Sequence, residues 1–384
     1  MNYTLYKIND NFVVLYSVCE LKYLEAVEST FKLGGNTDNN SSSSAASSGT
    51  KLALHPYVLA LGEQYAKGVI RGGNGRCKAM LRVFQQVVRD YEPPKDCRDV
   101  RQNLDHDVLK PSFQYWTLKC RPHSVSMGNA FTFLKLAVMS LDRDPTKLEE
   151  SKQTLMDTME EYIQQRITFA DTAISKHAST KIVNGDVILT YANSDVISHL
   201  LTEAASNNNI KFTVIVVDSK PLLEGKKLVQ KLTKAGIQCS YVLLNALSYV
   251  LGEVTKVFLG ASALMSDGSI LSRVGTACIA LMARSKNVPV LVCCETYKIS
   301  NRVQLESITG NELGNPLHFS SSEEKFDNLS LINPLYDLTP SKFVSGIVTE
   351  MGILPPTSVA VLLREMNPQD NNGEFTFKAD SNMF

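Results

Sequence analysis

The chain has 384 residues, enough for two domains with sizeable apolar cores. Its 39 lysines and arginines balance 39 aspartates and glutamates, so the charge gives no support for nucleic acid as a main partner. No run of about 18 apolar residues predicts a membrane span, and no basic segment before an apolar stretch predicts a signal peptide. We therefore expect a protein of the cytosol with no membrane partner.

Cysteine and histidine are spaced in a way that argues against structural metal and disulfide frameworks. The eight cysteines are scattered and form no C-x-x-C pair, and the six histidines lie far apart. Reduced, buried thiols are the expectation, and no metal site is predicted.

The N-terminal part, residues 1–51, is predicted to be a poorly defined extension. It contains a short apolar run and ends in a Ser/Asn-rich linker over residues 34–50, which cannot bury enough apolar surface to offset the entropy of ordering it.

Residues 52–183 are predicted to form a helical domain, because apolar side chains recur at three- and four-residue spacing. Glu92-Pro93-Pro94 is expected to end one helix, and Asp144-Pro145 to begin a long one. The first helical stripe comprises Leu54, Val58, Leu61, Tyr65 and Val69.

Residues 184–366 are predicted to form a Rossmann-like α/β domain with a mostly parallel sheet. Short apolar runs alternate with helical patterns, which implies strand–helix–strand crossovers. Residues 339–356 are expected to add another helix, 358–365 a last apolar strand, and 367–384 a loose tail. The predicted strands cover residues 187–191, 212–217, 241–244, 257–259 and 288–294.

The stretch from Val257 to Thr276, VFLGASALMSDGSILSRVGT, is predicted to hold the candidate site. It indicates a buried strand, a hairpin turned by Asp267-Gly268 and a helix start near Thr276. In an open α/β sheet, ligands bind at the carboxyl ends of strands, and a helix N-terminus offers unpaired N–H groups to an anion.

Two phosphate-binding motifs are absent or weak. Tyr191 is followed by Ala192-Asn193-Ser194-Asp195 rather than by the G-x-G-x-x-G of dinucleotide-binding sheets, so no nucleotide cofactor is expected. The run 72–76, GGNGR, lacks the G-K-S/T ending and is better interpreted as a turn between helices.

Several longer motifs resemble a known family. NGDVILTYANS, VVDSKPLLEGKKL and VPVLVCCETYK are similar to the family that unites sugar-phosphate isomerases with the regulatory subunits of translation initiation factor 2B. HPYVLALGEQYAKG and GGNGRCKAMLRVFQQVVRDY match its helical segment, and the resemblance covers about residues 54–364. Within that family the segments resemble the delta type of subunit more than the alpha or beta type.

The resemblance implies a scaffold that has lost the isomerase chemistry. The isomerases interconvert an aldose and a ketose with a cysteine and an aspartate, whose positions match Ala192 and Ser262 here. Alanine has no proton to transfer, and an unactivated serine is a poor acid and base near neutral pH. The family's phosphate-binding arginine matches Lys220, which lacks the planar fork of a guanidinium. No catalytic residue is therefore expected.

An anion or small ligand could still be held in the crevice, and helix capping or packing is the open alternative for Ser272 and Thr276. The candidate crevice residues are Arg76, Asn193, Lys220, Arg273, Gly275 and Thr276.

The resemblance further implies a regulatory subunit of the guanine-nucleotide exchange factor for initiation factor 2. Its partners would be the alpha, beta, gamma and epsilon subunits and the alpha subunit of initiation factor 2, whose phosphorylation it would help to sense.

Arg143, Lys147 and Lys152 are candidate partner contacts, with a solvated helix end as the alternative. The candidate subunit interface is Leu247, Tyr249, Val250 and Leu251, which are more apolar than a surface loop requires. The rival function is a sugar-phosphate isomerase of the ribose-1,5-bisphosphate type.

Overall fold

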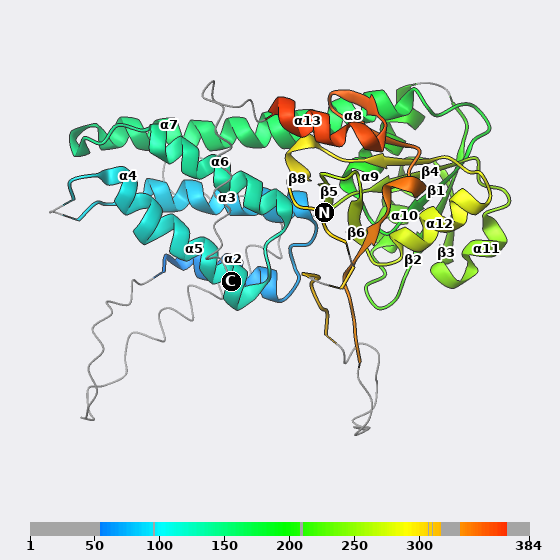
Figure 1. The fold of residues 1–384 in the computed structure, drawn as a ribbon, viewed down its shortest axis with the longest axis horizontal. Coiled ribbons are helices and arrows are strands. Elements are labelled where there is room, and N and C mark those ends of the chain that lie inside the picture. The colour runs from blue at the N-terminus through cyan, green and yellow to red at the C-terminus, as the bar shows by residue number, and fades with distance from the viewer. Residues whose placement is uncertain are drawn as a thin grey trace.

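The protein is described by a computed structural model for residues 54–94, 97–207, 210–305, 307–308, 310–315 and 331–366. The predictions for residues 1–51 and 367–384 lie outside these ranges. Figure 1 shows a bundle of helices on the left and an α/β half on the right. None of the described helices is both long and apolar enough to cross a bilayer.

The helical half is built around one apolar core. Trp116 is fully buried there, its indole N–H donates to the Val58 carbonyl oxygen at 2.7 Å, and its ring lies 5.1 Å from that of Phe84. The elements are α2 (Pro56–Ala66), α3 (Gly73–Arg89), α4 (Val100–Asn103), the π-helical η1 (Leu104–Leu109), α5 (Lys110–Tyr115), the π-helical η2 (Trp116–Cys120), α6 (Val125–Ser140) and the short η3 (Pro145–Lys147).

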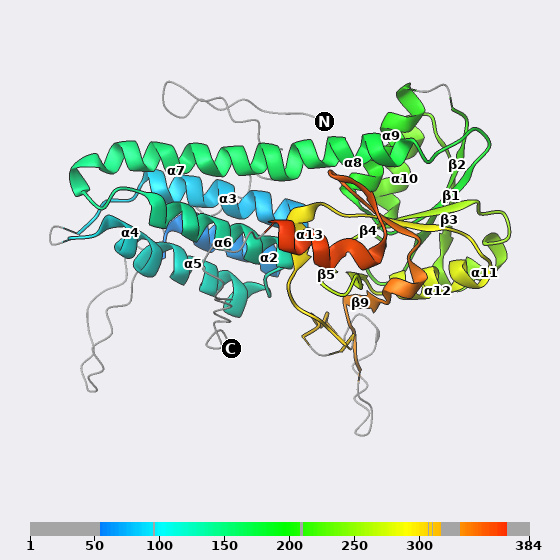
Figure 2. The same ribbon diagram turned by 45° about the horizontal axis from the view of Figure 1, so that its top comes forward.

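A long helix joins the two halves. It consists of α7 (Leu148–Tyr162), the π-helical η4 (Ile163–Phe169) and α8 (Ala170–Ser179), and Figure 2 shows it running along the top of the molecule into the α/β half. There α8 packs against α9 (Asp195–Asn207). The chain thus passes from helix to strand after residue 179.

The α/β half contains a seven-stranded sheet of order β11-β10-β7-β4-β1-β2-β3. Every neighbouring pair is parallel except β10 with β11, so the predicted mostly parallel sheet is confirmed. The strands are β1 (Val187–Tyr191), β2 (Thr213–Asp218), β3 (Gln238–Leu243), β4 (Lys256–Gly260), β7 (Val290–Cys293), β10 (Gly346–Thr349) and β11 (Gly352–Leu354).

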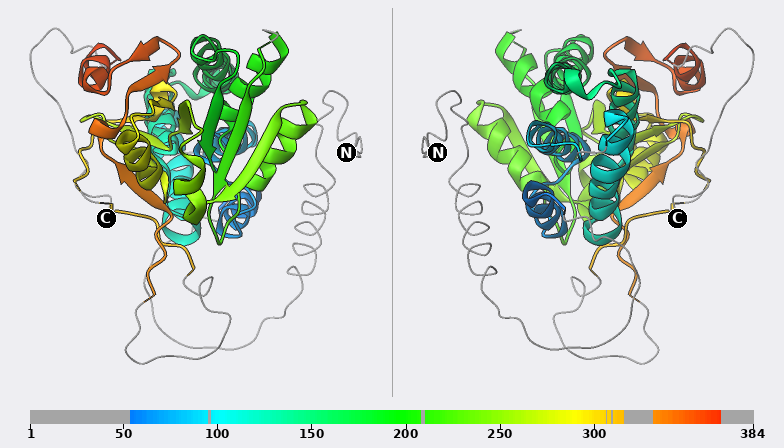
Figure 3. Two further views of the ribbon diagram at one scale, coloured as in Figure 1. Left: turned by 90° about the vertical axis from the view of Figure 1, so that its right-hand side faces the viewer. Right: turned by 90° about the vertical axis from the view of Figure 1, so that its left-hand side faces the viewer.

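Both faces of this sheet are covered by helices, which explains its continuous apolar strands. Ile188 of β1 packs into the core under α8, α9 and α10 (Gly225–Lys234). The next residue, Leu189, packs into the opposite core with α12 (Thr276–Ser285) and the short helix α11 (Leu247–Val250). Figure 3 shows the strands between these two sets of helices.

A second, small sheet carries the predicted hairpin. Its order is β8-β5-β6-β9, and β5 (Ala263–Met265) pairs antiparallel with β6 (Ile270–Arg273) around the turn at Asp267-Gly268. Strand β9 (Tyr336–Thr339) pairs with β6, and β8 (Ile299–Ser300) with β5. The short helix η6 (Thr296–Lys298) precedes β8.

The prediction for the last described segment was wrong. Residues 346–354 form strands β10 and β11, and α13 (Val359–Met366) is a helix rather than a strand. Every residue of β10 is buried, as expected of a strand covered on both faces, whereas Val359 and Leu362 are buried at helical spacing. A short apolar run cannot be assigned from periodicity alone, and here the two segments were exchanged.

Candidate functional site

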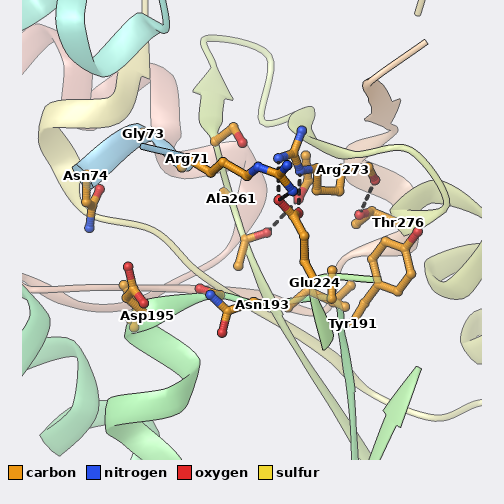
Figure 4. Close-up of a pocket in the computed structure, with 18 of the residues that line it drawn as sticks. Arg71, Gly73, Asn74, Tyr191, Asn193, Asp195, Glu224, Ala261, Arg273 and Thr276 are labelled. Atoms are coloured by element: carbon orange, nitrogen blue, oxygen red, sulfur yellow. Dashed lines mark hydrogen bonds and ion pairs between the residues drawn. The ribbon is translucent and has the colours of Figure 1, made fainter. Parts of the chain in front are cut away.

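The main cavity lies between the two halves of the molecule and has a volume of about 410 Å³. Its walls come from the loop between α2 and α3 and from the carboxyl ends of β1 and β4, as the close-up in Figure 4 shows. This is the position at which α/β sheets bind ligands. The polar side chains on its walls include Arg71, Asn74, Asn193, Asp195, Glu224, Lys227, Lys231, Ser262, Arg273, Thr276 and Lys298.

The two residues that match the isomerase catalytic positions both line this cavity. Ala192 follows β1 with a left-handed backbone (φ 54°), and its N–H donates to the Val217 carbonyl oxygen at 2.9 Å. Ser262 is half-buried after β4, and its N–H donates to the Leu271 carbonyl oxygen at 2.9 Å. Neither side chain carries a group that could exchange a proton with substrate carbon near neutral pH.

Arg273 is paired with a carboxylate at the cavity wall. Its Nε and Nη2 donate to Glu224 Oε2 and Oε1 at 2.9 and 2.8 Å, and Arg71 Nη1 lies 3.8 Å from Glu224 Oε1 (Figure 4). Burial lowers the pKa of Arg273, but Tyr336 and Glu224 raise it above its ordinary value overall. Nη1 is buried and has no hydrogen-bond partner among the described residues. Two arginines thus share one carboxylate, and one buried donor of Arg273 remains without a hydrogen-bond partner among the described residues.

The N-terminus of α12 is occupied by the chain itself. Asp337 of β9 accepts hydrogen bonds at Oδ2 from the N–H groups of Gly275 (2.7 Å) and Ala277 (3.0 Å). Burial raises the pKa of Asp337 to about 6, and these N–H groups act against that rise. The Thr276 hydroxyl donates to the Arg273 carbonyl oxygen at 2.6 Å. The predicted anion site on this helix is therefore filled by a carboxylate 60 residues further along the chain.

The remaining predicted crevice residues fall in different places. Asn193 lines the main cavity, and its Oδ1 is buried without a partner among the described residues. Lys220 instead lines a smaller neighbouring cavity of about 130 Å³. Arg76 lines neither: it is 1% exposed, donates from Nη2 to the Pro122 carbonyl oxygen and stacks over the Tyr65 ring at 5.3 Å. Arg76 is therefore a packed structural residue outside both cavities.

A buried polar cluster under the cavity joins the two halves, and the sequence did not reveal it. Glu295, which is 0% exposed, accepts from Asn74 Nδ2 at 2.5 Å and pairs with Lys298 Nζ at 2.6 Å. Asn74 in turn accepts from the Tyr297 hydroxyl at 2.6 Å, and Lys298 donates to the Ala261 carbonyl oxygen at 3.3 Å. Glu295 and Asn74 are 221 residues apart, so no local pattern could have paired them.

Two carboxyl groups in this cluster, those of Asp171 and Glu295, have pKa values shifted in opposite directions. Burial, and then the negative charge of Glu295, raise the pKa of Asp171 in α8 to about 8. Burial alone would raise the pKa of Glu295 too, but Lys298 and Asn74 hold it below its ordinary value. The cluster therefore carries Glu295 as the anion and Asp171 as the protonated acid at neutral pH.

The candidate partner contacts near α7 are only partly on the surface. Arg143 is exposed, and exposed Lys147 pairs with Asp142 at 2.7 Å. Lys152, by contrast, is 8% exposed and donates from Nζ to the Arg89 carbonyl oxygen at 3.3 Å, where it caps α3. Lys152 is therefore a buried capping residue, and the prediction that it contacts a partner was wrong.

Of the four candidate interface residues, two are buried and two are at least partly exposed. Leu247 and Leu251 are both 1% exposed and belong to the core beneath the sheet, so their apolar character is explained by packing. Tyr249 is 85% exposed and Val250 is half-buried. Only the outer side of α11 can meet a partner.

Two relatives that are about 40% identical to the chain carry the same name. The chain is 40% identical over 362 residues to translation initiation factor eIF2B subunit delta of Dictyostelium discoideum, covering 91% of this chain and 56% of that protein. It is 41% identical over 326 residues to the same subunit of Schizosaccharomyces pombe, covering 81% and 69%. The chain thus spans little more than half the length of the first of these relatives.

Structural and more distant relatives agree with this grouping. A chain in the crystal structure of the tetrameric eIF2B-beta2-delta2 complex from C. thermophilum is 32% identical, with a TM-score of 0.70, covering 78% of this chain and 92% of that one. Ribose 1,5-bisphosphate isomerase of Pyrococcus furiosus is 29% identical over 249 residues, covering 64% of this chain and 76% of that enzyme. The model of the initiation factor 2 subunit family matches residues 69–356. The chain belongs to the initiation factor 2 subunit family.

Proposed function

We propose that the chain is a non-catalytic, delta-type regulatory subunit of the guanine-nucleotide exchange factor for initiation factor 2, and that it works in the cytosol. The identity of about 40% to eIF2B delta subunits over most of the chain supports this assignment. The subunit would act by binding: it would assemble with the alpha, beta, gamma and epsilon subunits and contact the alpha subunit of initiation factor 2.

One observation carries the non-catalytic part of the proposal. Ala192 and Ser262 both stand on the wall of the cavity in which the related isomerases would act, and neither can serve as a general acid or base there. The cavity thus keeps the location of an active site but lacks titratable side chains at the two positions that match the catalytic residues of the isomerases.

The exposed residues suggest where partners bind. Tyr249 on α11 presents a large aromatic side chain to solvent and is our candidate for a subunit contact. Arg143 and Lys147, on the approach to α7, are candidates for contact with a phosphorylated partner, because their charges lie at the surface.

The cavity itself is a candidate site for a small polar ligand. Arg273 Nη1 and Asn193 Oδ1 supply one buried donor and one buried acceptor that lack protein partners among the described residues. Lys220 is exposed and lines the smaller neighbouring cavity, whereas the Gly275 N–H and the Thr276 hydroxyl are already engaged by Asp337 and the Arg273 carbonyl oxygen.

An assay with sugar phosphates tests the function against its rival. The purified chain is incubated with ribose-1,5-bisphosphate or methylthioribose-1-phosphate, and the ketose product is measured. We expect no ketose above the rate without protein. Turnover that is lost in a Ser262→Ala variant would establish the isomerase instead.

A further inference from the structure

The helix α10 carries an unusual concentration of one charge in a chain whose total charge is zero. Four of its ten residues are lysines, and all four are exposed. We call these residues, Lys226, Lys227, Lys231 and Lys234, the lysine face.

The fold explains why the lysines share one side of the helix. Leu228 and Leu232, one turn apart, are fully buried against the sheet and fix the inner side of α10. Lys227, Lys231 and Lys234 follow each other at helical spacing along a strip about 110° around the helix from these leucines, and Lys226 lies about 100° further round. The packing of the core therefore sets the cations in a row toward solvent.

The acids near this face neutralise little of its charge. Asp195 at the start of α9 lies 3.5 Å from Lys231, but both side chains are more than half exposed, so the pair is weak. Glu224, which precedes α10, is held by Arg273 and Arg71. Among the described residues, Lys226, Lys227 and Lys234 form no ion pair.

The spacing of the face suits an extended chain. Lys227 and Lys231 are one helical turn apart, about 6 Å along the axis at 1.5 Å per residue. Side chains on one side of an extended strand repeat about every 6.6 Å. Acidic residues at alternate positions of an extended segment would therefore meet Lys227 and Lys231.

We propose that the lysine face of α10 is a docking surface for an extended acidic segment of a partner protein. Lysine ammonium groups are compact charges without the fork that grips phosphate, and the face is only about 12 Å long, which fits a peptide better than a nucleic-acid duplex. Lys227 and Lys231 also line the cavity mouth, so a docked segment would border the crevice. The proposal does not depend on the regulatory role, because the isolated chain carries the whole surface.

Binding of a model peptide tests this surface. The full chain is titrated against a fluorescein-labelled peptide with glutamate at every second position, and anisotropy is recorded at about 50 mM and about 300 mM salt. Replacement of the four lysines by glutamine is expected to weaken binding at least about tenfold at the lower salt. The control replaces Lys176 and Lys181, two exposed lysines outside α10, by glutamine. It should bind the peptide as tightly as the wild type does.

Three results would overturn the proposal. They are equal affinity of the quadruple variant and the wild type, equal binding of a peptide with glutamine in place of glutamate, and tighter binding of a single-stranded oligonucleotide of equal charge at the same lysines. Thermal unfolding of each variant shows that the chain is folded, and loss of repulsion among four lysines is not expected to lower its midpoint.

Discussion

Arg273 and Glu224 form a two-point ion pair on the wall of the crevice, with Nε to Oε2 at 2.9 Å and Nη2 to Oε1 at 2.8 Å. The pair joins β6 to the start of α10 and reaches Arg71 in the helical half. The guanidinium that an anion would meet is therefore already engaged by the protein's own carboxylate, and we expect any affinity of the crevice for anions to depend on Glu224.

Replacement of Glu224 by glutamine should leave the positive charge of Arg273 without its carboxylate partner. We expect Glu224→Gln to bind inorganic phosphate at least about tenfold more tightly than the wild type, because Arg273 and Arg71 are no longer neutralised. Isothermal titration measures the affinity. The matched control is Glu160→Gln, which breaks a two-point pair with Arg82 that does not line the cavity. Unchanged affinity in the Glu224 variant would show that the crevice does not bind phosphate through these arginines.

The pH dependence of stability should report Asp171. Its pKa is raised to about 8 in the folded protein from an unfolded value of 3.8, so the folded chain binds the extra proton between these pH values. The free energy of unfolding should therefore fall as pH rises from about 4 to about 8, by at least about 1 kcal/mol from this group.

The Asp171→Asn variant isolates that contribution, because asparagine cannot ionise beside Glu295. Urea unfolding across the pH range should show a shallower decline in the variant than in the wild type. Asp157→Asn, on the exposed side of α7, is the control and should keep the wild-type slope. Parallel pH profiles for wild type and Asp171→Asn would contradict the proposed protonation of Asp171.

The cap of α12 should be measurable in stability. Asp337→Ala removes the acceptor of two N–H groups at the helix start, and we expect the free energy of unfolding to fall by about 1–2 kcal/mol. Denaturant titration at pH 7.5 measures the loss. A fall smaller than that caused by Asp157→Ala on α7 would show that the carboxylate does not cap the helix.

Both the backbone conformation at residue 275 and the side chains around it favour glycine. Its φ is 107°, and a Cβ built there would lie 2.5 Å from the Tyr191 hydroxyl oxygen. We expect Gly275→Ala to lower the free energy of unfolding by about 2–4 kcal/mol, whereas Gly252→Ala, with nothing within 4 Å and no such φ, should change it little. Combining Gly275→Ala with Tyr191→Phe should recover part of the loss, because the hydroxyl that meets the new Cβ is gone. An additive double variant would contradict that steric account.

The fold class could be predicted from sequence because its signals are local. Apolar runs such as β1 and β2, and the Asp267-Gly268 turn, identify their own structure whatever they contact. The placement of Ala192 and Ser262 on the crevice followed from the family resemblance together with the rule that ligands bind at strand ends. The domain boundary near residue 183 stays a prediction.

The features that the sequence missed depend on partners far along the chain. Asp337 caps α12 from 60 residues away, and Asn74 meets Glu295 across 221 residues. Lysine is a residue type usually found at the surface, yet the amine of Lys152 is buried at the end of α3. The apolar side chain of Leu247 would suit a subunit interface, yet it packs into the core. Composition alone cannot distinguish these alternatives, because each is settled by tertiary packing.

Assembly with a beta subunit tests the central claim most directly. The tagged chain is purified together with an eIF2B beta subunit, and the mass of the product is measured by light scattering. We predict a stable complex containing both chains, with an affinity at least about tenfold weaker for Tyr249→Asp than for Tyr57→Asp, an exposed tyrosine of the helical half. A chain that remains folded but alone at every concentration, and that converts ribose-1,5-bisphosphate to its ketose, would contradict the account.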